Sequence, residues 1–277
     1  KLFNLSSFTV GFCPVDIVRK KADVVIERKN LADLIPIFME KFGNKLLSIN
    51  YDWGAISLPI TIIPVKINKN IIESDNIPDL ILESLNLNNL QIYDNDVIII
   101  AQKIISKSEN RIFYLKDVVP SKKALEIFSI HEKDPRLIEL ILRESSSIVK
   151  VTNKTLIVET KYGFICANAG IDQSNVSNDK EVVLLLPENP DVSAKKIRKY
   201  IHHKIKKNFS IIISDTFGRP FRRGQTNIAI GIAGICPLKS YIGLKDSFGM
   251  ILNVTEIAIV DELASSAELV MGKTLGI

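Results

Sequence analysis

The sequence predicts an α+β fold, with mixed or antiparallel sheets and flanking helices. Segments typical of strands and of helices are interspersed along the chain, without the strict strand–helix alternation of a doubly wound sheet. Two segments, 155–170 and 239–254, carry turn residues between apolar runs and therefore predict antiparallel hairpins, the first turning at Lys161–Gly163 and the second between Lys245 and Gly249.

The first part of the chain differs from the rest. Residues 1–57 carry no chemical motif, so we expect an N-terminal extension of unknown role there and the main domain at 58–277. The segment 56–67, ISLPITIIPVKI, predicts one or two strands interrupted by Pro59 and Pro64.

Helices are predicted where apolar residues recur every three or four positions, and strands where β-branched apolar residues form a run. The predicted helices cover 75–86, 134–145, 193–207 and 254–273, and the predicted strands lie within 95–106, 181–191 and 209–215. The helix at 134–145 has the clearest start, because Asp134 can accept from its first amides and Pro135 suits its first turn.

Composition limits the class of protein. The chain has 277 residues, of which 46% are apolar, and a net charge of +5, which suits an anionic small substrate better than nucleic acid. Three scattered cysteines without a C-x-x-C pair indicate reduced thiols of a cytoplasmic protein, not a zinc site or a disulfide framework. No apolar run reaches the length of a membrane span.

A basic run, KKIRKYIHHKIKK, raises the alternative of nucleic-acid binding. Ile197, Ile201 and Ile205 recur every four residues, so the lysines between them fall on one face of a helix. No RNA-reading aromatic motif accompanies the run. We therefore interpret it as the solvated face of a core helix.

Asp215 and Thr216 end the apolar run IIIS abruptly. An ionised carboxylate at the end of a buried strand must be solvated or paired, and Mg²⁺ and Mn²⁺ favour carboxylate and hydroxyl oxygens. Asp172 follows another predicted strand and the small-residue turn Ala-Asn-Ala-Gly. The two carboxylates can converge on one cation or an ion pair, although each also fits a simple capping or Asx turn.

Basic side chains follow both strand ends. Arg219, Arg222 and Arg223 lie in a loop with glycines on both sides, and guanidinium groups match phosphate and carboxylate oxygens. Lys103 and Lys107 follow the strand at 95–106 and can reach phosphate as point charges. Exposed arginines and a solvated strand exit are the alternatives. No Walker loop and no G-x-G-x-x-G motif is present.

Four segments in order, AQKIISKSENR, NAGIDQSNV, ISDTFGRPFRRGQTNIAIGIAG and VTEIAIVDELASSAELVMGK, resemble the coenzyme F-420:L-glutamate ligase family, also called F-420-0 gamma-glutamyl ligase. The resemblance runs from about Pro59 to the end of the chain. It implies an α+β fold in an intertwined homodimer. It also implies a GTP-dependent ligase of coenzyme F-420 biosynthesis, which adds L-glutamate to F-420-0 through an acyl phosphate.

The resemblance implies two divalent ions, Mg²⁺ or Mn²⁺, with GTP as co-substrate and a monovalent cation as a further candidate. Asp172 and Asp215 resemble the ligands of one metal ion, through which they would act in catalysis, and Thr216 resembles a ligand of the second. The residues that resemble nucleotide contacts are Asn68, Lys69, Asn70, Ile71, Gln102, Lys103, Lys107 and Asn175. For Arg219, Arg222 and Arg223 we infer binding of phosphate or substrate.

The sequence departs from the family pattern in two places besides residues 1–57. Ile67-Asn68-Lys69 stands where the family usually has a Gly-Ile/Leu-Pro run. The chain ends at MGKTLGI, where the family continues into a further strand and a loop, so we expect the domain to be truncated at its C-terminus. Two alternatives stay open: a metal-dependent phosphotransferase or nucleotide hydrolase, and a non-catalytic nucleotide-binding protein.

Overall fold

The structure is a computed structural model and describes residues 2–5, 8–11, 24–25, 60–173 and 179–273. The chain divides into two compact units, Lys1–Thr61 with Leu238–Ala258, and Ile62–Pro237 with Ile259–Ile277. Helices and both parallel and antiparallel strand pairs are present, which confirms the predicted α+β class. No helix among the described residues is long and apolar enough to cross a membrane.

The first unit contains short strands. A three-stranded sheet has the order β1-β2-β3, with β1 at Leu2–Leu5, β2 at Phe8–Gly11 and β3 at Val24–Val25. A hairpin is present near the predicted segment 239–254, but its second strand lies beyond that segment, since β12 (Lys239–Ser240) pairs with β13 (Glu256–Ile257). Its turn lies where expected, since the Asp246 carboxylate accepts from the backbone amides of Phe248 and Met250.

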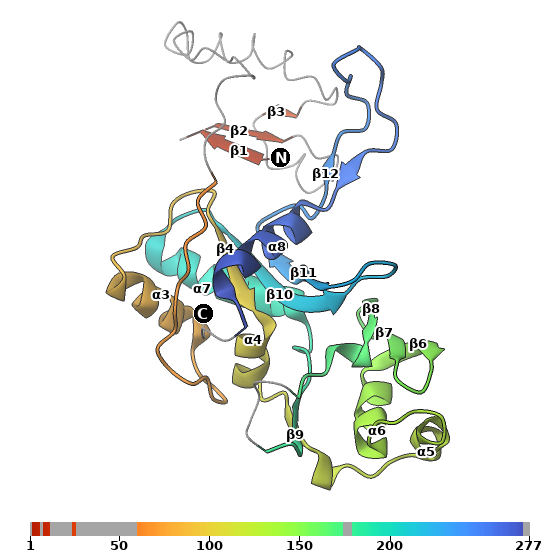
Figure 1. Cartoon of the computed structure of the whole chain (residues 1–277). Coiled ribbons are helices and arrows are strands. Elements are labelled where there is room, and N and C mark those ends of the chain that lie inside the picture. The colour runs from red at the N-terminus through yellow and green to blue at the C-terminus, as the bar shows by residue number, and fades with distance from the viewer. Residues whose placement is uncertain (1, 6–7, 12–23, 26–59, 174–178, 274–277) are drawn as a thin grey trace, which may run out of the picture. The chain divides into compact units, whose positions relative to one another are not determined.

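A three-stranded sheet of order β11-β10-β4 forms the centre of the second unit (Figure 1). β4 (Val97–Ala101) and β10 (Ser210–Gly218) are parallel, whereas β11 (Gln225–Ala233) is antiparallel to β10. β11 is a strand that the sequence analysis did not predict. The predicted strand at 95–106 is wrong in its second half, because the chain turns into helix α4 (Gln102–Ser108) directly after β4.

Helices cover both faces of this sheet. On one face α3 (Ile77–Leu87) and α7 (Pro190–Ile205) pack with α4 around Ile211 and Ile213. On the other face α8 (Ile259–Met271) packs Val260 and Ala264 against Ile212. The isoleucines of the basic run lie inward as predicted, with Ile197 and Ile201 buried. Helix α8 starts later than predicted, because Glu256 and Ile257 form β13.

The starts of α7 and α8 lie against β11. The Asp191 carboxylate accepts from the backbone amide of Ile232 at 2.7 Å, and the Asp261 carboxylate accepts from that of Ala229 at 2.8 Å. A side chain at Gly231 would bring its Cβ within 2.5 Å of the Pro190 backbone. The glycine therefore permits the close approach of α7 to the strand.

A second core lies between two helices and an antiparallel sheet. The helices are α5 (Lys122–Phe128) and α6 (Pro135–Arg143), and the sheet has the order β6-β7-β8, with bounds Ser145–Val151, Leu156–Thr160 and Ile165–Ala167. β7 and β8 form the predicted hairpin. Asp134 caps α6 as predicted, accepting from the Arg136 amide at 2.8 Å.

Short elements join the two cores. β5 (Ile112–Tyr114) pairs with β9 (Val182–Leu184), and the 3-10 helices η3 (Leu115–Asp117) and η4 (Asn168–Gly170) follow β5 and β8. The strand prediction at 56–67 is wrong for residues 60–67, which form no strand. Pro64 lacks the amide that a ladder requires, which explains this difference. Residues 56–59 lie outside the described part.

Candidate functional site

The candidate site lies where β4 ends beside β10. The parallel pairing of the two strands stops at Ser214 and Ala101. Gln102 begins α4 directly after β4, whereas Asp215 remains in β10, which continues to Gly218 and not only to Asp215 as predicted. Ligand sites of open sheets with parallel strands commonly lie beyond the carboxyl ends of those strands.

Asp172 reaches this site from the second core. It follows η4, where Asn168, Ala169 and Gly170 all have positive φ, at 55°, 53° and 70°. Its backbone amide and carbonyl pair with Leu184 at 2.9 and 2.8 Å, which fixes the turn on β9. The small-residue segment that the sequence analysis singled out is thus a tight left-handed turn that directs the chain toward α4.

The first turn of α4 holds the Asp172 carboxylate. Gln102 Nε2 donates to Asp172 Oδ2 at 3.1 Å, and Lys103 Nζ lies 3.3 Å from the same oxygen. Gln102 is only 1% exposed, and the Ser106 hydroxyl donates to its carbonyl oxygen at 2.7 Å. The structure therefore brings together Gln102 and Lys103 of one predicted motif and Asp172 of another.

The Asp215 carboxyl is electrostatically strained. Its pKa is raised to about 7, first by burial and then by the negative charge of Asp172, while the Thr216 amide, Lys103 and Lys273 act in the opposite direction. The pKa of the neighbouring Cys166 thiol is raised to about 12, first by burial and then by Asp215. The charge of Asp172 is thus felt at Asp215, while the predicted joint binding of a metal ion by the two carboxylates stays a prediction.

Two buried polar atoms of residues near these aspartates in the sequence have no hydrogen-bond partner within the described part of the chain. They are Ser214 Oγ, in the residue before Asp215 on β10, and Asn168 Oδ1, in the turn before Asp172. Buried polar groups are nearly always satisfied in folded proteins, so each of these atoms calls for a partner that the described residues do not supply. Among the described residues no group of three or more His, Cys, Asp or Glu could hold a metal ion.

Thr216 takes part in a separate network. Its hydroxyl donates to Asn227 Oδ1 at 2.7 Å and accepts from Lys273 Nζ at 2.7 Å. Glu268 on α8 accepts from Asn227 Nδ2 at 3.0 Å and from Lys273 at 2.9 Å. Because successive side chains of a strand point to opposite faces, Thr216 faces α8 while Asp215 faces α4.

Asn227, Glu268 and Lys273 were missed by the sequence analysis as site residues. All three lie within the motifs that carry the family resemblance, but no chemical pattern singles them out. The Lys273 ammonium is held by Thr216, Asn227 and Glu268 oxygens. These oxygens therefore already attract a positive charge on the α8 side of the sheet.

Lys107 lies one helical turn after Lys103 and is partly buried. Burial lowers its pKa, and the positive charge of Lys103 lowers it further. Two lysines on one short helix beside a carboxylate pair give this part of the site alternating negative and positive charge. Such an arrangement suits a ligand that carries both a cation and phosphate groups.

The remaining predicted nucleotide contacts lie in the segment before α3 or outside the described residues. Asn68, Lys69, Asn70 and Ile71 belong to an irregular segment, in which Lys69 Nζ pairs with the Asp75 carboxylate at 2.6 Å. The Ser74 amide donates to the Ser108 carbonyl at 3.0 Å, which ties the end of this segment to the end of α4. Asn175 lies outside the described part of the chain.

The three predicted arginines lie on the turn between β10 and β11, and only one of them is committed to internal bonds. Arg219 donates to the Arg223 carbonyl at 2.9 Å and to the Gly224 carbonyl at 3.3 Å. Arg222 and Arg223 are exposed, and no carboxylate of the described residues pairs with either guanidinium. The turn therefore carries two positive charges toward solvent.

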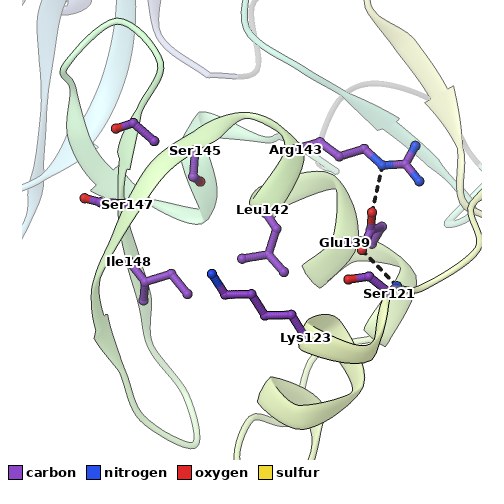
Figure 2. A pocket seen from close by; sticks show the side chains of 9 residues that line it. Ser121, Lys123, Glu139, Leu142, Arg143, Ser145, Ser147 and Ile148 are labelled. Carbon is purple, nitrogen blue, oxygen red and sulfur yellow. Dashed lines mark hydrogen bonds and ion pairs between the residues drawn. The ribbon is translucent and has the colours of Figure 1, made fainter.

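A pocket of about 270 Å³ lies elsewhere, between α5, α6 and β6 (Figure 2). Figure 2 shows Lys123 extending between Leu142 and Ile148, while Glu139 pairs with Arg143 and accepts from the Ser121 amide. None of the predicted site residues lines it. The pocket is thus separate from the strand-end site.

Comparison with known proteins identifies the family. The family model described as F420-0:Gamma-glutamyl ligase matches residues 66–276. The chain belongs to this ligase family. The match includes Asp172, Asp215 and Thr216 and both helices that flank them.

Relatives named coenzyme F420:L-glutamate ligase are similar over most of the chain. The protein of Methanothermobacter thermautotrophicus is 44% identical over 199 residues, which cover 72% of this chain and 78% of that protein. The Methanocaldococcus jannaschii protein is 47% identical over 195 residues, covering 69% and 77%. The Methanosarcina mazei protein is 47% identical over 204 residues, covering 74% and 77%.

Proposed function

We propose that this chain catalyses the ligation of L-glutamate to coenzyme F-420-0, in the biosynthesis of coenzyme F-420, at the expense of GTP. Family membership and the names of the relatives support the reaction class. The observation that carries the assignment to this site is the meeting of Asp172 and Asp215 beside Lys103. In the proposal the active protein is a homodimer.

Amide formation explains why the site combines acids and bases. A carboxylate is a poor electrophile, and phosphoryl transfer from GTP converts it into an acyl phosphate that the glutamate amine can attack. The phosphoryl group gathers negative charge, which fixed positive charges stabilise. In the proposal Lys103 and Lys107 lie against the phosphates, and Gln102 orients Asp172 through the hydrogen bond at 3.1 Å.

The donor set fits a divalent cation. Burial and the negative charge of Asp172 raise the pKa of the Asp215 carboxyl, so a cation beside it would stabilise its ionised form. In the proposal Asp172 and Asp215 hold one Mg²⁺ or Mn²⁺ ion, and Thr216 holds a second on the other face of the sheet. Bound there, the ions would neutralise phosphate charge. Water and substrate oxygens complete the shell of such ions in many enzymes.

The test is a reaction of the full-length protein with F-420-0, L-glutamate, GTP and Mn²⁺, with mass spectrometry of the products. The mono-glutamyl product is expected with GTP, and it should be absent for Asp215→Asn. Asp79→Asn is the matched control, because the exposed Asp79 pairs with Lys204 on α7, away from the strand ends. Phosphate release at the full rate without glutamate would replace the proposal with a nucleotide hydrolase.

A further inference from the structure

The turn between β10 and β11 carries an aromatic side chain that the proposed reaction does not use. We define the arm as residues 219–224, which lie beyond the last pair of the ladder, Gly218 with Gln225. Phe221 at its tip is fully exposed, at 106% of its reference area. Its φ is +60°, a region that bulky side chains rarely adopt. The chain thus holds a large apolar ring in water at a conformational cost.

The arm is a braced turn. The Arg219 guanidinium spans it by donating to the Arg223 and Gly224 carbonyls, and Gly224 supplies a φ of +93°. Pro220 fixes one further backbone angle. The position of Phe221 is therefore set by the backbone, because the ring itself has no packing. The Arg219 guanidinium is engaged in these two hydrogen bonds, whereas the neighbouring Arg222 and Arg223 are exposed to solvent.

The arm continues directly from the strand-end site. Asp215 and Thr216 pair with Ile228 and Asn227, and the ladder ends two residues later at Gly218 and Gln225. At about 3.3 Å per residue, the tip lies roughly 10–20 Å from the carboxylates along the strand. Figure 1 shows the β10–β11 hairpin continuing past the end of β4 as a free arm.

We propose that the arm binds the distal part of the acceptor substrate. Resting on the proposed function, that substrate has its reacting carboxylate at one end, then a phosphodiester, and an aromatic deazaflavin ring at the other. With the carboxylate at Asp172 and Asp215, the ring extends along the arm, where Phe221 stacks on it. Arg222 and Arg223 pair with the phosphodiester, because guanidinium groups bind phosphate in a bidentate manner.

The charge and the surface of the arm fit this occupant. Two guanidinium groups beside one exposed ring offer positive charge and a π-face together, which an anionic aromatic molecule requires. Glutamate has no ring, and the proposed nucleotide phosphates lie at α4. The arm therefore distinguishes the acceptor from the other two substrates.

Equilibrium titration of the full-length protein, followed by deazaflavin fluorescence, tests this proposal. Two ligands are compared: F-420-0, and the deazaflavin riboside that lacks the phosphodiester. Phe221→Ala should raise the Kd of both ligands by on the order of tenfold, the size of one lost ring stack. Phe221→Trp should restore binding. The double variant Arg222→Gln, Arg223→Gln should weaken F-420-0 alone.

Matched controls come from the same chain. Phe248→Ala removes another exposed ring, at 90% of its reference area, in the other unit. The double variant Lys195→Gln, Lys196→Gln removes two positive charges from the solvated face of α7. Both controls should leave each Kd unchanged. In steady-state assays Phe221→Ala should raise the KM for F-420-0 and leave the KM for GTP unchanged.

The outcomes separate this inference from the function on which it rests. If the wild-type protein ligates glutamate but Phe221→Ala binds both ligands as before, the arm has no such role while the ligase assignment stands. An altered oligomeric state of Phe221→Ala with unchanged Kd values would assign the arm to a second copy of the chain and overturn the inference. If the wild-type protein neither binds nor converts F-420-0, the proposed function itself fails.

Discussion

The strand-end site and the α5–α6 core treat their charged groups in opposite ways. In the core, Arg136 pairs with Asp134 at 2.6 Å and with Glu181 at 2.8 Å, and Glu139 pairs with Arg143 while accepting from the Ser121 amide. At the strand ends, two carboxylates repel each other and two buried polar atoms lack partners. The core pairs its acids with basic groups, whereas the site holds one carboxyl, Asp215, whose ionised form burial and Asp172 disfavour.

This difference shows which part of the chain is built for stability and which for binding. Arg136 holds the pKa of Asp134 below its ordinary value, and hydrogen bonds from Ser121, followed by Arg143, do the same for Glu139, so these groups contribute to stability at neutral pH. The raised pKa of Asp215 has the opposite sign, so its ionised form opposes folding. Residues whose charge destabilises the fold are expected at functional sites.

The largest effect is expected from Asp215→Asn. Activity should fall at least about 100-fold, because a proposed metal ligand is lost. In metal-free buffer at pH 8, the free energy of unfolding should rise by about 1–3 kcal/mol, since a charge that is unfavourable in the fold is removed. Mn²⁺ should raise the Tm of the wild-type protein but not of this variant. If Asp215→Asn had a lower Tm than the wild-type protein in metal-free buffer, the contrast between the site and the core would be contradicted.

In the α5–α6 core, a substitution should lower stability and leave activity unchanged. Ile138 is fully buried between α5, α6 and β7, so Ile138→Ala should lower the free energy of unfolding by about 2–5 kcal/mol. Turnover per folded molecule should not change. Leu125→Ala, at an exposed position of α5, is the control and should change neither quantity. Denaturant titration and activity assays at low temperature measure the two effects separately.

His131 gives the core one pH-sensitive exception. It is 2% exposed, its Nδ1 accepts from the Lys133 amide at 3.1 Å, and its Nε2 has no partner. Burial lowers its pKa from 6.5, and Lys133 adds to this shift. The unfolded chain therefore binds the proton more readily, so stability should fall as the pH decreases below about 6.5. His131→Asn, which retains an acceptor, should be less stable at pH 8 but show no such fall.

The smallest effects are expected at the start of α6. Asp134→Ala should cost about 1 kcal/mol, because the Arg136 amide loses its cap. Asp134→Asn keeps an acceptor and loses only the partly exposed ion pair, which should cost less than about 1 kcal/mol. Thermal unfolding of both variants separates the contribution of the hydrogen bond to the Arg136 amide from that of the ion pair with the Arg136 guanidinium. Equal losses would show that the ion pair, and not the cap, stabilises the helix start.

Sequence reasoning was successful where one local pattern decides the structure. Asp134 and Pro135 gave the start of α6, and the isoleucines of α7 gave its buried face. It placed the end of β4 too late, because an apolar run does not show that the strand stops at Ala101 and a helix begins at Gln102. It also failed for β11, whose threonine, asparagine and glycine resemble loop residues until Gly231 is seen against Pro190.

The site was predicted in part for the same reason. Asp172 and Asp215 each follow an apolar run in the sequence, and the resemblance paired them, so their convergence could be expected. Glu268 could not be assigned in this way, because it meets Asn227 only when α8 folds back across 41 positions. Nor could Arg219 be separated from Arg222, since its hydrogen bonds to Arg223 and Gly224 depend on the geometry of the turn.

The two aspartates at the starts of α7 and α8 have one more consequence. β11 is an edge strand of the central sheet. An exposed edge strand is where a second molecule can add by backbone pairing and begin aggregation. Asp191 and Asp261 occupy the amides of Ile232 and Ala229 at that margin, so an incoming strand finds these donors already engaged. Ordinary helix starts thus protect the protein against fibre-like self-association.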